Sequence, residues 1–127
     1  MANAILVVDD NADVCRTLSR LLRHMGFSAE CAFSGPEALS HLRDHKPGLI
    51  LLDYMMPEMN GLEVLTKVKS DSATAAIPVV MLTAVSDKRT ADTAINSGAA
   101  AYWIKGRIDY DRLRTDVSKF VSPSQPA

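Results

Sequence analysis

The sequence has few of the features that mark disulfide-bonded, membrane-spanning or nucleic-acid-binding proteins. Its two cysteines, Cys15 and Cys31, have neither CxxC nor zinc-like spacing, so we expect small buried apolar groups. No apolar run approaches the length of a membrane span, and no charged-then-apolar leader precedes the first strand-like segment. With 14 basic and 15 acidic residues, the formal net charge of -1 offers no broad basic surface. These absences predict a cytoplasmic protein that binds neither membranes nor nucleic acid directly.

The length and the hydrophobic content suit one domain. The chain has 127 residues, and 47% hydrophobic residues are enough to enclose a core. We expect this domain to span residues 1–121. Residues 122–127 are rich in serine and proline, which predicts a flexible tail or the start of a linker.

Strand-like and helix-like segments alternate five times along the chain. Short apolar runs predict strands at residues 4–8, 27–32, 49–53, 77–82 and 99–104. Apolar residues at helical spacing follow each strand, and Gly26 and Gly98 suit the ends of two of these helices. Short connections between alternating elements favour a parallel sheet with helices on both faces. We therefore predict an α/β fold, a doubly wound five-stranded parallel sheet of order 2-1-3-4-5.

The fourth predicted helix, residues 87–97, is polar and rich in small residues. Only Ala91, Ala94 and Ile95 are expected to pack inward. A helix with so few apolar contacts should be the least firmly held, and it should move at low energetic cost.

Five polar residues follow predicted strands at the points where the strands end: Asp9, Asp10, Asp53, Thr83 and Lys105. The carboxyl ends of parallel strands share one edge of the sheet, where ligands of open α/β sheets bind. Three carboxylates held close together repel one another and favour a bound cation. Mg²⁺ is the natural candidate because it is a hard ion that prefers oxygen ligands.

Thr83 and Lys105 suggest an anion next to that cation. A hydroxyl group can donate a hydrogen bond to an anion, and an ammonium group supplies a point charge. A simpler interpretation is that Lys105 only neutralises the acidic cluster and Thr83 only caps its strand. The residues alone leave both interpretations open.

The methionines and histidines are weaker ligand candidates. Met55, Met56 and Met59 carry soft thioethers that do not suit Mg²⁺, so we expect them to pack in the loop after Asp53. His41 and His45 are four residues apart, as a helical metal-binding pair would be, but no third ligand is evident. We interpret them as a solvated pair.

The order of these motifs resembles that of bacterial response-regulator receiver domains over residues 5–121. The matching segments are the apolar run ending in Asp9-Asp10, the stretch DYMMPEMNG at 53–61, Thr83-Ala84 and the stretch GAAAYWIK at 98–105. The resemblance implies a flavodoxin-like fold and a phosphorylation-dependent signalling switch. It does not imply an enzyme that turns over an external substrate.

The resemblance also implies how the domain is phosphorylated. Asp53 would accept a phosphoryl group from a histidine kinase or a histidine phosphotransferase, and Thr83 and Lys105 would contact the phosphoryl oxygens. The domain would catalyse this transfer and its own dephosphorylation. Its output would be another domain of the same regulator or a separate protein.

The resemblance further implies a specific metal site. Mg²⁺, for which Mn²⁺ could substitute, would be bound by Asp10, Asp53 and the backbone carbonyl of Met55, with Asp9 contributing through water. A carboxylate nucleophile that forms an acyl phosphate needs its charge offset by a metal and an ammonium group, so this arrangement agrees with the chemistry.

Two positions near the fifth strand bear on signalling. Tyr102 lies where the family has its switch aromatic, three residues before Lys105, and Trp103 should face the opposite side of the sheet. Gly106 departs from the family, which usually has proline after the lysine. The loop after Lys105 could therefore take another path.

Two other functional classes remain alternatives. A Mg²⁺-dependent aspartyl phosphatase would have a second acid two residues after its nucleophile, where this chain has Met55. A flavin-binding or scaffolding domain of the same topology would leave Asp9, Asp10 and Asp53 without a role.

Overall fold

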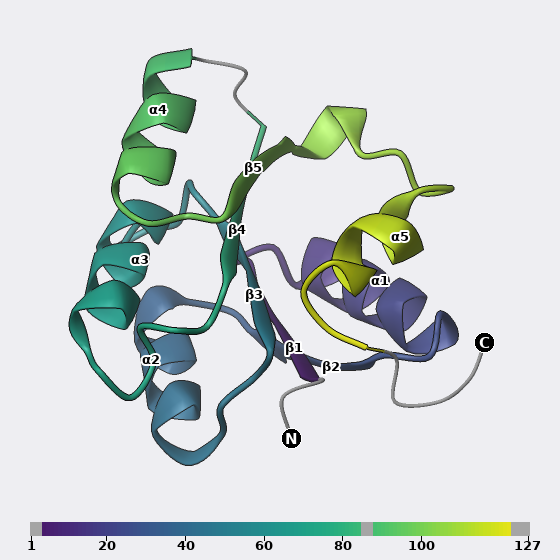
Figure 1. Cartoon of the computed structure of the whole chain (residues 1–127), viewed down its shortest axis with the longest axis horizontal. Helices are drawn as coiled ribbons and strands as arrows, with labels where there is room; N and C mark the ends of the chain where they lie inside the picture. Colours follow the sequence, from purple (N-terminus) through teal and green to yellow (C-terminus); the bar gives the residue numbers. More distant parts are fainter. Residues whose placement is uncertain (1–3, 85–87, 123–127) are drawn as a thin grey trace.

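The computed structural model describes residues 4–84 and 88–122, which form a five-stranded parallel sheet between two layers of helices (Figure 1). The strands are β1 Ala4–Val8, β2 Ser28–Ala32, β3 Leu49–Asp53, β4 Val79–Thr83 and β5 Ala101–Ile104. The helices are α1 Ala12–His24, α2 Gly35–Asp44, α3 Gly61–Ser70, α4 Lys88–Asn96 and α5 Leu113–Ser118, with a 3-10 turn η1 at Lys105–Arg107. The strand order β2-β1-β3-β4-β5 confirms the predicted topology.

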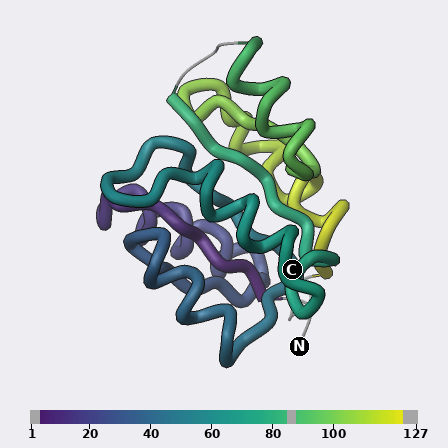
Figure 2. The backbone as a smooth tube through the Cα atoms, turned by 90° about the vertical axis from the view of Figure 1, so that its left-hand side faces the viewer, coloured from purple at the N-terminus to yellow at the C-terminus, as the bar shows by residue number. Residues whose placement is uncertain are grey.

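The two faces of the sheet pack into two separate apolar cores. Side chains alternate along a strand, so Leu52 packs in the core under α2, α3 and α4, while Leu51 packs in the core under α1 and α5. All residues of β3 and β4 are buried, as expected for central parallel strands. Figure 2 shows α2, α3 and α4 side by side on one face. None of the described helices is long and apolar enough to cross a membrane.

Local capping signals explain where three helices begin. Asn11 accepts hydrogen bonds at the start of α1, and Ser34 accepts one from the Glu37 backbone at the start of α2. Asn60 and Glu63 form a reciprocal capping box at the start of α3. These caps place α1 and α3 directly after the loops that follow Asp9 and Asp53.

The fourth helix, α4, buries only Ala94, the fewest buried side chains of the five described helices. Ala91 is half-buried, but Ile95 is 47% exposed, so the prediction that Ile95 packs inward is wrong. The expected first residue, Asp87, lies outside the described residues. Helix α4 therefore makes fewer apolar contacts with the core than its sequence indicated, because Ile95, its largest apolar side chain, is on the solvent side.

The end of the chain differs in detail from the predicted boundaries. The Ala99 backbone amide donates to the Ala94 carbonyl and so closes α4, which explains why β5 begins at Ala101 instead of residue 99. The last helix, α5, ends at Ser118, although Val121 beyond it is still buried. The predicted tail at 122–127 lies, after its first residue, outside the described residues.

Of four side chains with predicted environments, three lie as expected and one does not. Tyr102 packs against the core under α2, α3 and α4, and Trp103 packs against the opposite core, so the prediction that they face opposite sides is confirmed. Cys15 is fully buried as expected, whereas Cys31 is only half-buried next to the Ser19 hydroxyl.

Candidate functional site

Three carboxylates meet at the carboxyl edge of the sheet. Asp9 and Asp10 follow β1, and Asp53 is the last residue of β3. One carboxylate oxygen from each residue lies within 4.8 Å of the others. Asp9 is 1% exposed and Asp53 is 4% exposed, while Asp10 is exposed to solvent. The structure therefore brings together the acidic residues that the sequence predicted to converge.

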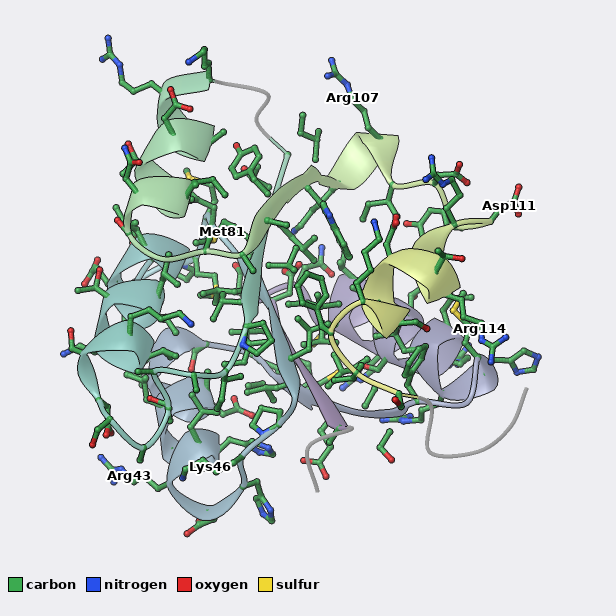
Figure 3. The ribbon with its side chains drawn as sticks, in the orientation of Figure 1. Arg43, Lys46, Met81, Arg107, Asp111 and Arg114 are labelled. Atoms are coloured by element: carbon green, nitrogen blue, oxygen red, sulfur yellow. The ribbon has the colours of Figure 1, made fainter. Side chains whose placement is uncertain are left out.

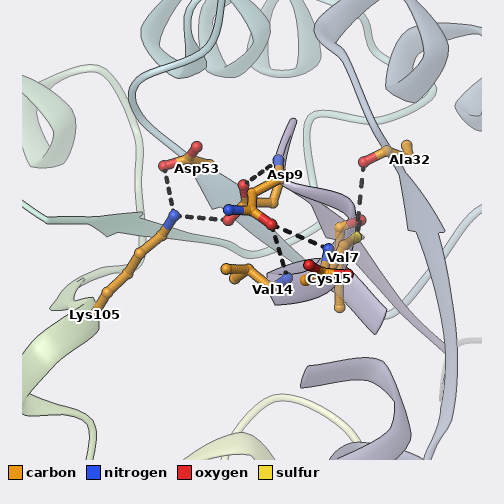
Figure 4. A network of polar contacts seen from close by, with 9 residues as sticks. Val7, Asp9, Val14, Cys15, Ala32, Asp53 and Lys105 are labelled. Carbon is orange, nitrogen blue, oxygen red and sulfur yellow. Dashed lines mark hydrogen bonds and ion pairs between the residues drawn. The ribbon is translucent and has the colours of Figure 1, made fainter. Parts of the chain in front are cut away.

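Lys105 reaches this cluster from the end of β5. Its Nζ lies 2.7 Å from Asp9 Oδ2 and 3.2 Å from Asp53 Oδ1, so one ammonium group bridges two buried carboxylates (Figure 4). The chain turns directly into η1 after Lys105, and a Cβ at Gly106 would meet no atom within 4 Å. The glycine that replaces the expected proline therefore still leaves the lysine in the cluster.

Backbone hydrogen bonds hold Asp9 in position. The Asn11 backbone amide donates to Asp9 Oδ1 at 2.9 Å, and the Asp9 backbone amide donates to the Ala32 carbonyl at 3.1 Å. The Asn11 side chain in turn accepts from the backbone amides of Asp13 and Val14 at the start of α1. The loop between β1 and α1 is thus a pre-organised support for the carboxylate.

The loop after Asp53 is held by its neighbours in the sheet and by α3. The Tyr54 backbone amide donates to the Leu82 carbonyl, and the Gly61 amide donates to the Tyr54 carbonyl, both at 2.8 Å. A Cβ on Gly61 would lie 2.3 Å from the Asp53 carbonyl oxygen. This supporting role of Gly61 was not predicted, although a glycine at the start of a helix was the available signal.

The methionines of this loop are less uniform than expected. Met56 is buried and Met59 is half-buried, but Met55 is 63% exposed, so the prediction that all three side chains pack is wrong for Met55. Met56 joins the core under α2, α3 and α4, whereas Met55 beside it lies on the solvent side of the loop.

Burial and the neighbouring charges shift the proton affinity of the site. Burial, followed by repulsion from Asp9, raises the pKa of Asp53 to about 6, although Lys105 opposes this rise. Burial disfavours the charged form of Lys105, but its hydrogen bond to Asp9 and the charge of Asp53 outweigh this and raise its pKa. Lys105 thus stays protonated. Its single positive charge does not neutralise all three carboxylates of the cluster.

The remaining predicted residues lie on neighbouring strands. Thr83 is fully buried at the end of β4, one residue beyond Leu82, which is the register partner of Asp53. Tyr102 pairs in register with Met81. Because residues two apart in a strand share a face, Thr83 lies on the same face as Met81 and Tyr102.

The donor set fits a hard divalent cation. Three carboxylates provide oxygen donors only, and one of them is exposed to water, so a hydrated ion such as Mg²⁺ can enter. Lys105 supplies a single positive charge against three negative ones, which leaves charge for a cation to offset.

Comparison with known proteins agrees with this geometry. Residues 5–118 match the family model of the response regulator receiver domain. The chain is 40% identical over 115 residues to the transcriptional regulatory protein ZraR of Salmonella typhimurium, covering 91% of this chain and 25% of ZraR. It is 34% identical over 120 residues to the transcriptional regulatory protein CrdR of Helicobacter pylori, covering 94% of this chain and 55% of CrdR.

The fold comparison gives the same family. The chemotaxis response regulator CheY4 of Vibrio cholerae superimposes with a TM-score of 0.85 at 25% sequence identity, covering 95% of this chain and all of that one (100%). The chain spans about a quarter of ZraR and about half of CrdR. Family match, topology and acidic edge together lead to one conclusion: this chain belongs to the response regulator receiver domains, the phosphorylation-dependent switches of two-component signalling.

Proposed function

We propose that Asp53 is the phosphoryl acceptor of this receiver domain. In the transfer, the phosphorus–nitrogen bond of a partner's phosphohistidine breaks and a bond forms between phosphorus and a carboxylate oxygen of Asp53. The observation that carries the proposal is the Asp53 carboxylate, buried at the end of β3, 3.2 Å from the Lys105 ammonium and within 4.8 Å of two further carboxylates. Mg²⁺-dependent labelling by a small phosphodonor such as acetyl phosphate tests it.

Receiver domains bind Mg²⁺ at an acidic aspartate cluster, and the cluster of this chain suits the ion. We assign Asp10, Asp53 and the Met55 backbone carbonyl as direct ligands and Asp9 as a ligand through water, with Mn²⁺ as a substitute ion. When bound, the cation offsets the charge of the carboxylates and of the phosphoryl oxygens. Lys105, held at Asp9 and Asp53, supplies a second positive charge for those oxygens.

Asp10→Asn is expected to weaken Mg²⁺ binding more than Asp9→Asn. Loss of an outer-shell partner, such as the water-mediated ligand Asp9, lowers metal affinity by roughly tenfold or more. Loss of a direct ligand such as Asp10 should lower the affinity further. Titration with MgCl₂ followed by the fluorescence of Trp103, the single tryptophan, measures both affinities. Equal losses in the two variants would contradict the assignment of Asp10 as the direct ligand.

The phosphorylation signal is proposed to leave the site through Thr83 and Tyr102. An acyl phosphate at Asp53 adds anionic oxygens that attract the Thr83 hydroxyl, and a shift of Thr83 frees space on the face that it shares with Tyr102. The thinly packed α4 then follows at little cost, because Ala94 is its only buried side chain among the described residues. The readout surface is accordingly α4, β5 and α5.

Thr83→Ala should still accept phosphate on Asp53 but transmit the change poorly. The nucleophile and its cationic partners remain, whereas the coupling hydroxyl is lost. Amide hydrogen exchange of residues 84–105, with and without a beryllofluoride phosphate mimic, measures the response. We expect the wild-type protection change in this segment to fall by at least half; an undiminished response in Thr83→Ala would refute the relay.

The partners follow from the same proposal. The donor is a histidine kinase or a histidine phosphotransferase, and the output is a further domain or a separate protein. The relatives ZraR and CrdR are transcriptional regulatory proteins, which supports a place in a longer cytoplasmic regulator. In this proposal residues 1–121 form the receiver, 122–127 begin a linker or tail, and nucleic acid is contacted only by another domain.

Autocatalysis is part of the proposal, whereas turnover of an external substrate is not. We propose that the domain catalyses the phosphoryl transfer to Asp53 and the later hydrolysis of its own acyl phosphate. The aspartyl phosphatase alternative is disfavoured, because an exposed thioether at Met55 cannot serve as the second acid. A turnover assay with phosphomonoesters separates the two functions.

A further inference from the structure

A second cluster of ligand-type side chains lies away from the phosphorylation site, between α2 and β2. His41 Nε2 on α2 is 3.1 Å from Glu30 Oε2 on β2. The ring of His45, the C-cap residue of α2, is tilted by 37° to the ring of His41, with centroids 5.0 Å apart. These three residues, together with Asp44 and Lys46, line a cavity of about 200 Å³. The sequence predicted a solvated histidine pair; in the structure His41 is half-buried, and only the fold brings Glu30 next to it.

We propose that His41, His45 and Glu30 form a binding site for a divalent transition metal of the Zn²⁺ class. Imidazole nitrogens suit Zn²⁺, Cu²⁺ and Ni²⁺, and a carboxylate is a common third ligand. His41 lies in the last turn of α2, and His45 is the extended residue that caps this helix, yet their rings stay side by side with centroids 5.0 Å apart. Two imidazoles bound at a tetrahedral angle through bonds of about 2.0–2.1 Å have centroids about 5 Å apart, which is the observed separation.

Side-chain rotation would bring the three donor groups together around a metal ion. The donor atoms of Glu30, His41 and His45 do not all lie within 4.8 Å of one another, since only the aspartate cluster meets that limit among the described residues. The Glu30 side chain is 62% exposed and His45 is exposed, so both can turn without disturbing the core. His41, half-buried and already paired with Glu30, is the fixed point of the site.

Negative and positive groups are balanced at this end of α2, so its charge does not oppose a bound cation. The carbonyl groups of the last helical turn carry partial negative charge. Lys46 Nζ already donates to the carbonyls of Leu42 and Arg43, so one ammonium group is bound at this helix end. Glu30 and Asp44 provide negative charge that offsets the repulsion between Lys46 and an incoming ion. Figure 3 shows Arg43 and Lys46 at this end of α2.

The cluster is separate from the aspartate site in both place and ligand chemistry. His45 lies at the end of α2 shortly before β3 begins, whereas Asp53 ends β3. Mg²⁺ prefers oxygen ligands and has little affinity for imidazole. Excess Mg²⁺ should therefore fill the aspartate site and leave the histidine site open to Zn²⁺.

Calorimetric titration of the whole chain with ZnCl₂ in excess Mg²⁺ tests the proposal. We expect one zinc ion per chain, with affinity at least about tenfold weaker in His41→Gln, in His45→Gln and in Glu30→Gln. His24→Gln is the matched control, because it makes the same substitution at an exposed histidine in the last turn of α1, outside the cluster. Its zinc affinity should equal that of the wild type.

Three results would overturn the site. The first is the absence of zinc binding in excess Mg²⁺, and the second is unchanged affinity in any of the three cluster variants. The third is loss of zinc binding in Asp10→Asn, which would assign the ion to the aspartate cluster. Circular dichroism of each variant shows whether α2 is intact, and the exposed positions of Glu30 and His45 keep at least two variants interpretable.

Discussion

Asp53→Asn is expected to reduce phosphoryl uptake to background while the domain stays folded. The amide keeps the size and shape of the side chain but lacks the anionic oxygen that attacks phosphorus. Stability should not fall, because the change removes one of three close carboxylates and Lys105 keeps its 2.7 Å contact with Asp9. Incubation with labelled acetyl phosphate and Mg²⁺, followed by thermal unfolding of the same samples, measures both effects.

A control for this experiment is Asp111→Asn, which changes an exposed carboxylate between η1 and α5. This variant should be labelled like the wild type, since it does not touch the aspartate cluster. Acid-labile phosphate that persists in Asp53→Asn at the wild-type level would show that another residue is the acceptor. Full labelling only in the presence of Mg²⁺ would in addition tie the uptake to the acidic cluster.

Gly61→Ala is expected to destabilise the domain by about 3 kcal/mol, the upper end of the cost of overpacking. The added Cβ would lie 2.3 Å from the Asp53 carbonyl oxygen and 2.9 Å from the Tyr54 Cα. Both atoms belong to the backbone, so no side-chain rotation can relieve the clash. The Gly61–Tyr54 hydrogen bond and the position of Asp53 should both shift, which predicts slower phosphoryl uptake as well.

Urea unfolding at constant pH measures the free energy of unfolding of this variant. The matched control is Gly106→Ala, where the new Cβ would meet no atom within 4 Å and the change should stay within about 0.5 kcal/mol. Both variants make the same chemical substitution, so their difference isolates the close approach of α3 to the Asp53 strand. Equal stability of the two variants would contradict the predicted clash at Gly61.

The fold was predictable from the sequence because its signals are local. Apolar runs of about five residues, helical periodicity and helix-ending glycines such as Gly26 and Gly98 depend on neighbours within a few positions. Parallel strands joined by helices leave few topologies, so the strand order 2-1-3-4-5 also followed. The convergence of Asp9, Asp53 and Lys105 on one edge was a direct consequence of that topology.

Other features depend on how the elements pack, and no local pattern reports them. The Lys105–Asp9 contact joins residues 96 positions apart, and its 2.7 Å distance results from how η1 follows β5. Helical spacing alone could not tell that Ile95 lies on the solvent side of α4.

Close approaches between elements are the clearest example. Gly61 meets the backbone of Asp53, and Glu30 meets His41, only because α3 and α2 pack at particular distances from their strands. Periodicity specifies which face of an element is apolar, but the distance between two packed elements depends on every side chain between them. The sequence therefore predicted which residues gather at the acidic edge of the sheet, while the tertiary structure alone established which of their atoms touch.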